Sequence, residues 1–222
     1  DPQRNTYSYP AGIAHFLEHK MFEKQDQDVM NEFSRMGANV NAFTSYNETA
    51  YYFSTSGSIE GPLDLLLDFV QQLDISGASV EKEKGIIVSE LNMYQQMSDS
   101  RLLMETYQSL FHEHPLKYDI GGDENSVRST TRQQLEACYQ RNYHPSTMML
   151  VGVSGKDPEQ IMEQIRRNQR SKQFASLCPI HRRPIREAAS VVRERHAFSM
   201  DITVPKLAVA CKLAPCVDAL ER

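Results

Sequence analysis

Apolar positions recur along the chain with two different spacings, and these spacings separate helices from strands. Between Gly12 and Phe22, the residues Ile13, Leu17 and Met21 are four apart, which predicts a helix with one buried face. The same period predicts further helices over residues 26–37, 62–73, 79–96, 102–111, 130–145 and 157–168.

Alternation of polar and apolar residues predicts the strands. It runs through residues 38–56 on both sides of the turn-forming segment Tyr46–Glu48, which indicates a β-hairpin that belongs to a larger sheet. Residues 147–155 predict a short buried strand, and residues 198–215 predict two more. The expected fold class is therefore α+β, with a mainly antiparallel sheet packed by helices.

Composition narrows the class of protein. The chain has 222 residues, a net charge of −5 and 24% charged residues, without a block of Lys and Arg, so nucleic acid is not an expected partner. Only His181–Arg186 is locally basic, and a solvated linker explains it. No apolar run approaches the roughly 18 residues of a membrane span, and the N-terminus lacks a signal-peptide pattern, so we expect no membrane partner.

The cysteines indicate a reducing compartment. They are scattered without a CxxC spacing, which favours reduced thiols and a cytoplasmic location. A bridge or a metal site formed by the last two is an alternative, but packing or loop thiols are favoured. The four are Cys138, Cys178, Cys211 and Cys216.

The helix from Gly12 to Phe22 contains HFLEH, which places possible metal-binding and catalytic side chains on its polar face. His15, Glu18 and His19 lie at i, i+3 and i+4, so their side chains share one face. Two imidazoles at this spacing can bind one Zn2+, and a glutamate beside a ligand can deprotonate a water. An exposed helix that happens to carry two histidines is the alternative.

A zinc site needs a third protein ligand. Glu83 and Glu90 are seven apart on the helix predicted over residues 79–96, so they share a face and either could point at the histidines. A solvated charged face is the ordinary interpretation of such a pair. His112 and His114 are separated by one residue in a predicted loop, where surface or packing roles are favoured. The same interpretation applies to the three remaining histidines, His144, His181 and His196.

An HxxEH motif followed about 70 residues later by ExxxxxxE resembles the pitrilysin/insulinase family of inverzincin zinc metallopeptidases. The segments GIAHFLEHKMF, NAFTSYNETAYYF, EKEKGIIVSELNMY and HPLKYDIGG are similar to that family, in the same order. The resemblance covers the chain from Pro10 to about Gly155, and EHKMFE is typical of the insulinase-like proteins of Gram-positive bacteria.

This resemblance implies a role for each polar residue of the two helices. His15, His19 and Glu90 would be the zinc ligands. Glu18 would be the general base of peptide-bond hydrolysis, and Glu83 would be the assisting carboxylate behind a ligand.

The resemblance also implies a substrate-binding strand. In this family, the strand that matches Asn41, Ala42, Phe43 and Thr44 binds a peptide substrate as an added β-strand beside the metal. From the residues alone, the segment is a plain edge strand.

The family closes its active site as a two-domain clamshell, of which this chain would supply one half. We expect residues 1–195 to form the N-terminal zinc-binding peptidase domain without its first strands, and residues 196–222 to begin a second, truncated homologous domain. The expected partner is the missing second half or a partner subunit, and the isolated fragment would be weakly active or inactive. Two alternatives are a non-catalytic, peptide-binding partner subunit and a structural zinc protein with a fourth ligand such as Cys138.

Overall fold

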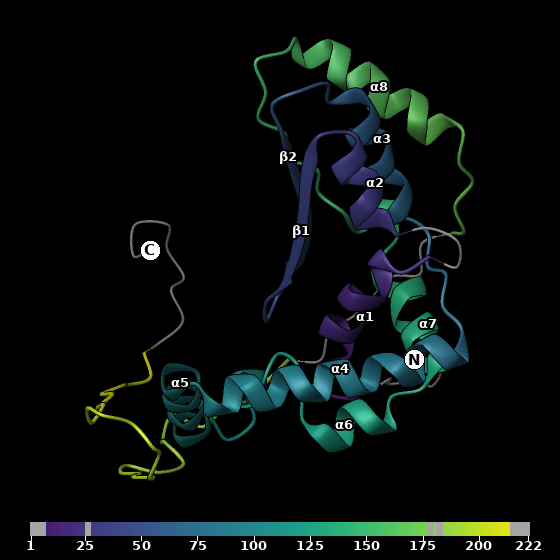
Figure 1. Ribbon diagram of the computed structural model, residues 1–222. Helices are drawn as coiled ribbons and strands as arrows, with labels where there is room; N and C mark the ends of the chain where they lie inside the picture. The colour runs from purple at the N-terminus through teal and green to yellow at the C-terminus, as the bar shows by residue number, and fades with distance from the viewer. Residues whose placement is uncertain (1–7, 25–27, 177–179, 181–183, 214–222) are drawn as a thin grey trace. The chain divides into compact units, whose positions relative to one another are not determined.

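A computed structural model describes residues 8–24, 28–176, 180 and 184–213 (Figure 1). The chain divides into two compact units, the first made of residues 1–88 and 120–181 and the second of residues 89–119 and 182–222. The described elements are, in order, α1 (Ile13–Phe22), α2 (Val29–Arg35), β1 (Ala38–Thr44), β2 (Thr49–Thr55), α3 (Glu60–Phe69), α4 (Gly77–Gln96), α5 (Ser98–Leu110), η1 (Pro115–Lys117), α6 (Glu124–Ser129), α7 (Arg132–Asn142), η2 (Pro145–Thr147) and α8 (Pro158–Arg170).

Helix α1 begins at a close contact between two backbone segments. Gly12 has a φ of +82°, a backbone conformation that is strained for any residue with a side chain. A Cβ atom on Gly12 would lie 2.1 Å from the carbonyl oxygen of Gly121, and one on Gly122 would lie 2.4 Å from that of Ala11. Glycines on both sides therefore let the start of α1 pack directly against the chain that leads into α6.

The apolar stripe predicted for α1 is buried in the first unit. Ile13 is 7% exposed, and Leu17 and Met21 are fully enclosed. Phe16 and Lys20 are buried on the same helix, with exposures of 1% and 0%. A fully enclosed lysine was not predicted, because lysines almost always keep their ammonium in water.

Strands β1 and β2 form the predicted antiparallel hairpin, in a register that pairs Ala38 with Thr55 and Thr44 with Thr49. Helices α2 and α3 pack against one face of it (Figure 1). Burial alternates along β1, as expected for a strand with one face on a core. The buried core residues at this face are Met21, Val29, Phe33, Ala38, Leu66 and Phe69.

Helix boundaries follow local capping chemistry. Asp28 caps α2 by accepting from two backbone N–H groups, and Thr131 and Gln134 form a capping box at α7. Asp123 and Ser126 form a second capping box that starts the short helix α6. The sequence pattern did not predict α6, because its six residues are too few to show a period.

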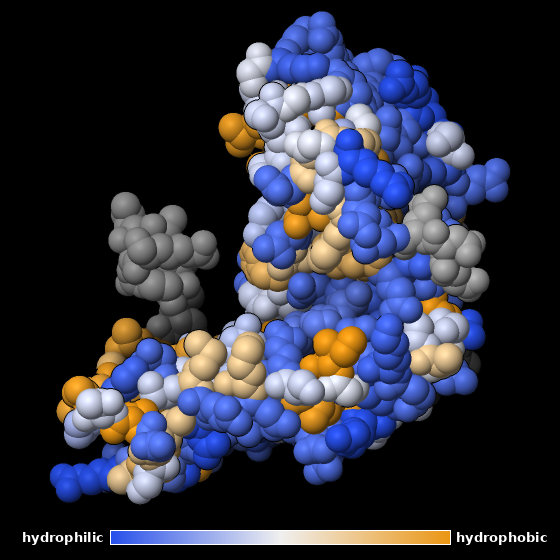
Figure 2. Space-filling view, viewed as in Figure 1, coloured by the Kyte–Doolittle hydropathy of each residue, from blue (hydrophilic) through white to orange (hydrophobic). Residues whose placement is uncertain are grey.

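Helix α8 covers the outer side of α3. The Gln164 amide donates to the backbone carbonyl of Glu60 at 2.6 Å, and the Asn168 amide donates to the carboxylates of Asp64 and Asp68. The surface over α8 is mainly hydrophilic (Figure 2). The described residues after Arg170 form neither helix nor strand.

The second unit contains the end of α4, α5 and a long irregular segment. The Glu187 carboxylate accepts the backbone N–H groups of His112, Glu113 and His114 at 2.7–2.8 Å, and Lys212 donates to it at 2.6 Å. Among the helices described, none is long and apolar enough to cross a membrane.

Two strand predictions are wrong for the described residues. No strand is assigned in 147–155, where Met149 is 89% and Val153 is 99% exposed. None is assigned in 198–213 either, where Leu207 and Val209 are 88% and 92% exposed. A strand requires a hydrogen-bonded neighbour, and β1 and β2 pair only with each other in the described part of the chain. The α+β class itself is confirmed.

Candidate metal centre

The two histidines of HFLEH face each other across one turn of α1. Their Nε2 atoms lie 3.2 Å apart, and their rings meet edge to face. Two nitrogens that bind one tetrahedral zinc at about 2.0–2.1 Å would be separated by about 3.3 Å. The separation of the His15 and His19 nitrogens therefore suits a shared ion.

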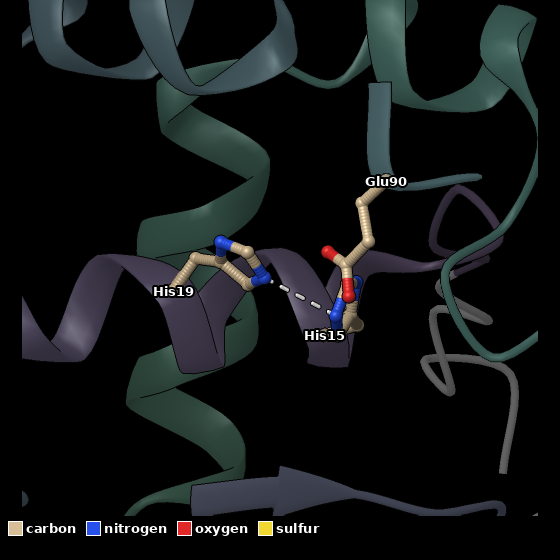
Figure 3. Close-up of side chains that lie close together, drawn as sticks. All are labelled: His15, His19 and Glu90. Atoms are coloured by element: carbon tan, nitrogen blue, oxygen red, sulfur yellow. Dashed lines mark hydrogen bonds between the residues drawn. The ribbon is translucent and has the colours of Figure 1, made fainter. Parts of the chain in front are cut away.

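Glu90 supplies the third donor from α4. One ligand atom from each of His15, His19 and Glu90 lies within 4.8 Å of the others. Figure 3 shows the two imidazoles turned toward each other on α1, with the Glu90 carboxylate beside the His15 ring. From the sequence alone, either Glu83 or Glu90 could be the third donor. Of these two, only Glu90 belongs to the cluster in the described structure.

Glu83 lies behind one of the ligands instead. Its Oε1 atom is 3.0 Å from Nδ1 of His19. An ionised carboxylate can only accept, so His19 Nδ1 donates and a neutral His19 keeps its lone pair on Nε2, which faces His15. The hydrogen bond from His19 holds the pKa of the Glu83 carboxyl below its usual value, burial opposes this, and the Lys20 ammonium lowers the pKa further.

Lys20 is a residue of this site that sequence reasoning missed. Its Nζ atom lies 3.6 Å from Oε2 of Glu83, and it also contacts the Glu23 carboxylate. A sequence signal was present, because Lys20 falls three residues after Leu17 and four after Phe16, on the apolar stripe of α1.

Glu18 points to the hairpin. The Thr44 hydroxyl donates to its Oε2 atom at 2.5 Å, a length typical of a hydrogen bond to a carboxylate. Thr44 Oγ1 is also 3.3 Å from Thr49 Oγ1. The Tyr143 hydroxyl is 2.8 Å from that of Tyr51.

The predicted substrate strand lies in β1, directly beside Glu18. Asn41 and Phe43 are exposed, whereas Ala42 and Thr44 are half-buried. The Ala42 N–H donates to Oδ1 of its neighbour Asn41 at 2.8 Å. Strand β1 pairs with β2 on one edge, and within the described residues no other strand pairs with its second edge.

The other candidate residues do not belong to this donor cluster in the described structure. His112 and His114 pack in the loop held by Glu187, His144 is 3.0 Å from the Ala175 carbonyl, and His196 is 2.9 Å from Glu105. Cys138 is a buried free thiol and Cys211 an exposed one, so neither joins the metal donors in the described structure. His181, Cys178 and Cys216 lie outside the described residues.

Two imidazoles and one carboxylate, held on two helices, form the donor set of a catalytic zinc site. The residues fit Zn2+, because both His nitrogens converge and the second nitrogen of His19 is held by a carboxylate. An α+β domain that carries these donors on an inverted HxxEH motif is the arrangement that inverzincin metallopeptidases use.

Comparison with known families agrees with this class. The model described as Insulinase (Peptidase family M16) matches residues 4–124, and that described as Peptidase M16 inactive domain matches residues 129–216. The chain therefore belongs to the insulinase family, as the motifs predicted.

Individual relatives support the same assignment. The uncharacterized zinc protease YmfH of Bacillus subtilis (strain 168) is 44% identical over 203 residues, which are 91% of this chain and 47% of that protein. The mitochondrial-processing peptidase subunit beta of Dictyostelium discoideum is 28% identical over 161 residues, 70% of this chain and 34% of that subunit. The predicted similarity to a Gram-positive relative is confirmed.

A solved structure extends the comparison to three dimensions. A crystal structure described as an M16-like peptidase from Alicyclobacillus acidocaldarius superposes with a TM-score of 0.83 at 43% identity, over 86% of this chain and 45% of that one. The chain spans about half the length of these bacterial relatives, as expected for one half of a clamshell peptidase.

Proposed function

We propose that the chain supplies the zinc centre of a metalloendopeptidase that hydrolyses peptide bonds. The observation that carries this proposal is the cluster of His15, His19 and Glu90 donors, whose atoms lie within 4.8 Å of one another next to Glu18. Relatives named zinc proteases support it.

In this proposal, His15, His19 and Glu90 hold Zn2+. A bound zinc ion supplies a Lewis acid that polarises the scissile carbonyl and acidifies water. Glu18 accepts the proton of the attacking water and returns it to the leaving amine. The Thr44 hydroxyl orients the Glu18 carboxylate for this transfer.

We propose that the peptide binds as an added strand along the second edge of β1, at Asn41, Ala42, Phe43 and Thr44. An edge without a strand partner in the described structure can pair with an extended peptide. The Ala42 N–H now bonds its neighbour's amide oxygen, so Asn41 must release this donor when the peptide pairs. The exposed Phe43 would face the substrate side chains.

A second half would complete the active site. We propose that residues 1–195 form the zinc-binding domain and residues 196–222 begin its homologous partner, either in one protein or as a separate subunit. Orienting a peptide and stabilising the developing oxyanion can contribute several orders of magnitude in rate, and no motif in this chain provides those groups. The 222-residue chain alone should therefore be a poor peptidase.

The test combines metal content with peptide cleavage. The purified full-length protein should contain about one Zn2+ per chain and should cleave a quenched peptide library. A chelator should abolish this cleavage, and added zinc should restore it. A metal-free protein that cannot be loaded with zinc, or cleavage that a chelator leaves unchanged, would refute the proposal. Equal turnover by the 222-residue chain would refute the need for a second half.

A non-catalytic partner subunit is the second candidate. It is favoured by one observation, the match of residues 129–216 to the model described as Peptidase M16 inactive domain. Such a subunit would bind peptides without cleaving them, even when loaded with zinc.

We also propose a cytoplasmic location, because the described cysteines Cys138 and Cys211 are free. Labelling of the exposed Cys211 by a membrane-permeant thiol reagent in intact cells, but not by an impermeant one, would support it; labelling by both would contradict it.

A further inference from the structure

Lys20 carries a positive charge into the core of the first unit. Its side chain is 0% exposed, and it lies between His19 and the equally enclosed Met21 on α1. Removing an ammonium from water costs several kcal/mol unless close partners compensate for it. A methionine at this position would continue the apolar stripe of α1, so packing alone does not call for a lysine.

The partners of Lys20 connect α1 to α4. Its Nζ donates to the backbone carbonyl of Ser79 at 3.3 Å and lies 3.6 Å from Oε2 of Glu83. Ser79 and Glu83 are four residues apart, so one ammonium contacts two successive turns of α4. The Glu23 carboxylate contacts the same ammonium from the end of α1.

The two oxygens of Glu83 therefore have different partners. Oε2 faces Lys20, whereas Oε1 lies 3.0 Å from Nδ1 of His19. The ion pair at Oε2 and the hydrogen bond at Oε1 together restrain the carboxylate against rotation away from the imidazole. The orientation of the His19 ring, and the lone pair on its Nε2, then depend on the lysine through Glu83.

We propose that Lys20 is a positioning residue of the metal centre, which locks Glu83 against His19 so that His19 Nε2 faces the ion. This inference rests on the proposed zinc site. It adds a buried cation to the carboxylate–histidine pair that orients a zinc ligand. Lys20 does not touch the ion or the substrate; it acts through Glu83 alone.

The decisive experiment is a double-mutant cycle on zinc affinity in the full-length protein. K20M, E83Q and the double variant are titrated with zinc against a competing chelator, and folding is checked by circular dichroism. Loss of an outer partner typically weakens metal binding about 10- to 100-fold, and we expect this for K20M and for E83Q. Because Lys20 acts through Glu83, the double variant should bind zinc no more weakly than E83Q alone.

Lys24 provides the matched control. It lies one turn further along the chain and donates to the backbone carbonyls of Phe69 and Gln72, without a contact to Glu83. K24M removes a partly buried ammonium of the same kind, so it should leave zinc affinity within about twofold of the unmodified protein.

A second readout follows the His19 tautomer. In the zinc-free protein, histidine 15N shifts should report a proton on Nδ1 of His19, and K20M should give a mixture of tautomers. If K20M does not fold, K20Q offers the same comparison with a neutral side chain that can still donate to Ser79.

The outcomes separate the two proposals. An unmodified protein that binds no zinc refutes the metal centre and this inference together. Zinc binding that K20M leaves unchanged, or a K20M effect of the same size with and without E83Q, refutes the role of Lys20 alone and makes it a structural residue.

Discussion

Replacing Thr44 with valine removes one hydroxyl and keeps the shape of a β-branched strand residue. The hydroxyl donates to Oε2 of Glu18 at 2.5 Å. Because β1 keeps its backbone groups, the proposed peptide-binding edge is unchanged. The substitution therefore separates the orientation of the general base from the binding of substrate.

The expected magnitude follows from the hydrogen bond. A bond to a charged group contributes about 1.5–3 kcal/mol, and about 1.4 kcal/mol corresponds to a factor of ten in rate. Glu18 and Thr44 are both half-buried, which favours the lower end of this range. We expect kcat of T44V to fall by about tenfold, with KM within about twofold of the unmodified value.

The assay is cleavage of a quenched peptide by the full-length, zinc-saturated protein. T44S, which keeps the hydroxyl, should restore most of kcat. Thr55 is the matched control, because its hydroxyl donates to the Gly37 carbonyl at 3.1 Å at the other end of the same hairpin. T55V should leave kcat unchanged. An unchanged kcat in T44V, or a T44S variant as slow as T44V, would refute the orienting role of the hydroxyl.

Three further predictions concern the base, the third donor and pH. E18Q keeps the shape of the side chain but cannot accept a proton, so turnover should fall by about two orders of magnitude or more while zinc stays bound. E90Q removes a charged donor and should weaken zinc binding by more than the roughly 10- to 100-fold typical of outer partners, measured by chelator competition. Burial raises the pKa of Tyr139 and Tyr143 to about 12, and raises that of Tyr51 as well. Unfolded tyrosines ionise near pH 10, so between about pH 10 and the folded pKa values the unfolded state loses protons that the folded state keeps. The folded state therefore has its full stability below about pH 10 and loses stability as pH rises through the folded pKa values. The free energy of unfolding in urea should therefore be lower at about pH 11 than at about pH 9.

Each of these predictions has its own contrary result. Equal turnover in E18Q would remove Glu18 as the base, and loss of zinc would make it a ligand. For E90Q, the control is E136Q on α7, where Glu136 pairs with Arg132 at 2.7 Å and does not belong to the donor cluster. Equal zinc affinities in both variants would contradict the assignment. For the tyrosines, ultraviolet titration should show part of the phenolate signal only on unfolding, and full ionisation near pH 10 in the folded protein would contradict their burial.

The local sequence pattern alone determined several secondary-structure elements and part of the candidate metal centre. The period of α1 fixes which of its faces is apolar, and it places His15, Glu18 and His19 together before any tertiary contact forms. The alternation around Tyr46–Glu48 defines the hairpin, because a strand's two faces differ at every residue. Motif order was sufficient to indicate the insulinase family.

The local sequence pattern gave a wrong prediction for residues 147–155 and 198–213, where apolar runs predicted strands that the structure does not form. Strand formation depends on a partner backbone as well as on side-chain preference, so propensity alone could not decide it.

Only the tertiary structure decided how the two helices and the hairpin meet. Glu83 and Glu90 share one helical face, yet one contacts His19 Nδ1 and the other lies with the donor cluster. Thr44 reaches Glu18 across 26 residues of sequence. Lys20 stands on an apolar stripe where the sequence gives no partner, and its ammonium is enclosed only because α4 brings Ser79 and Glu83 to it. Contacts between distant segments depend on packing, which local periodicity does not encode.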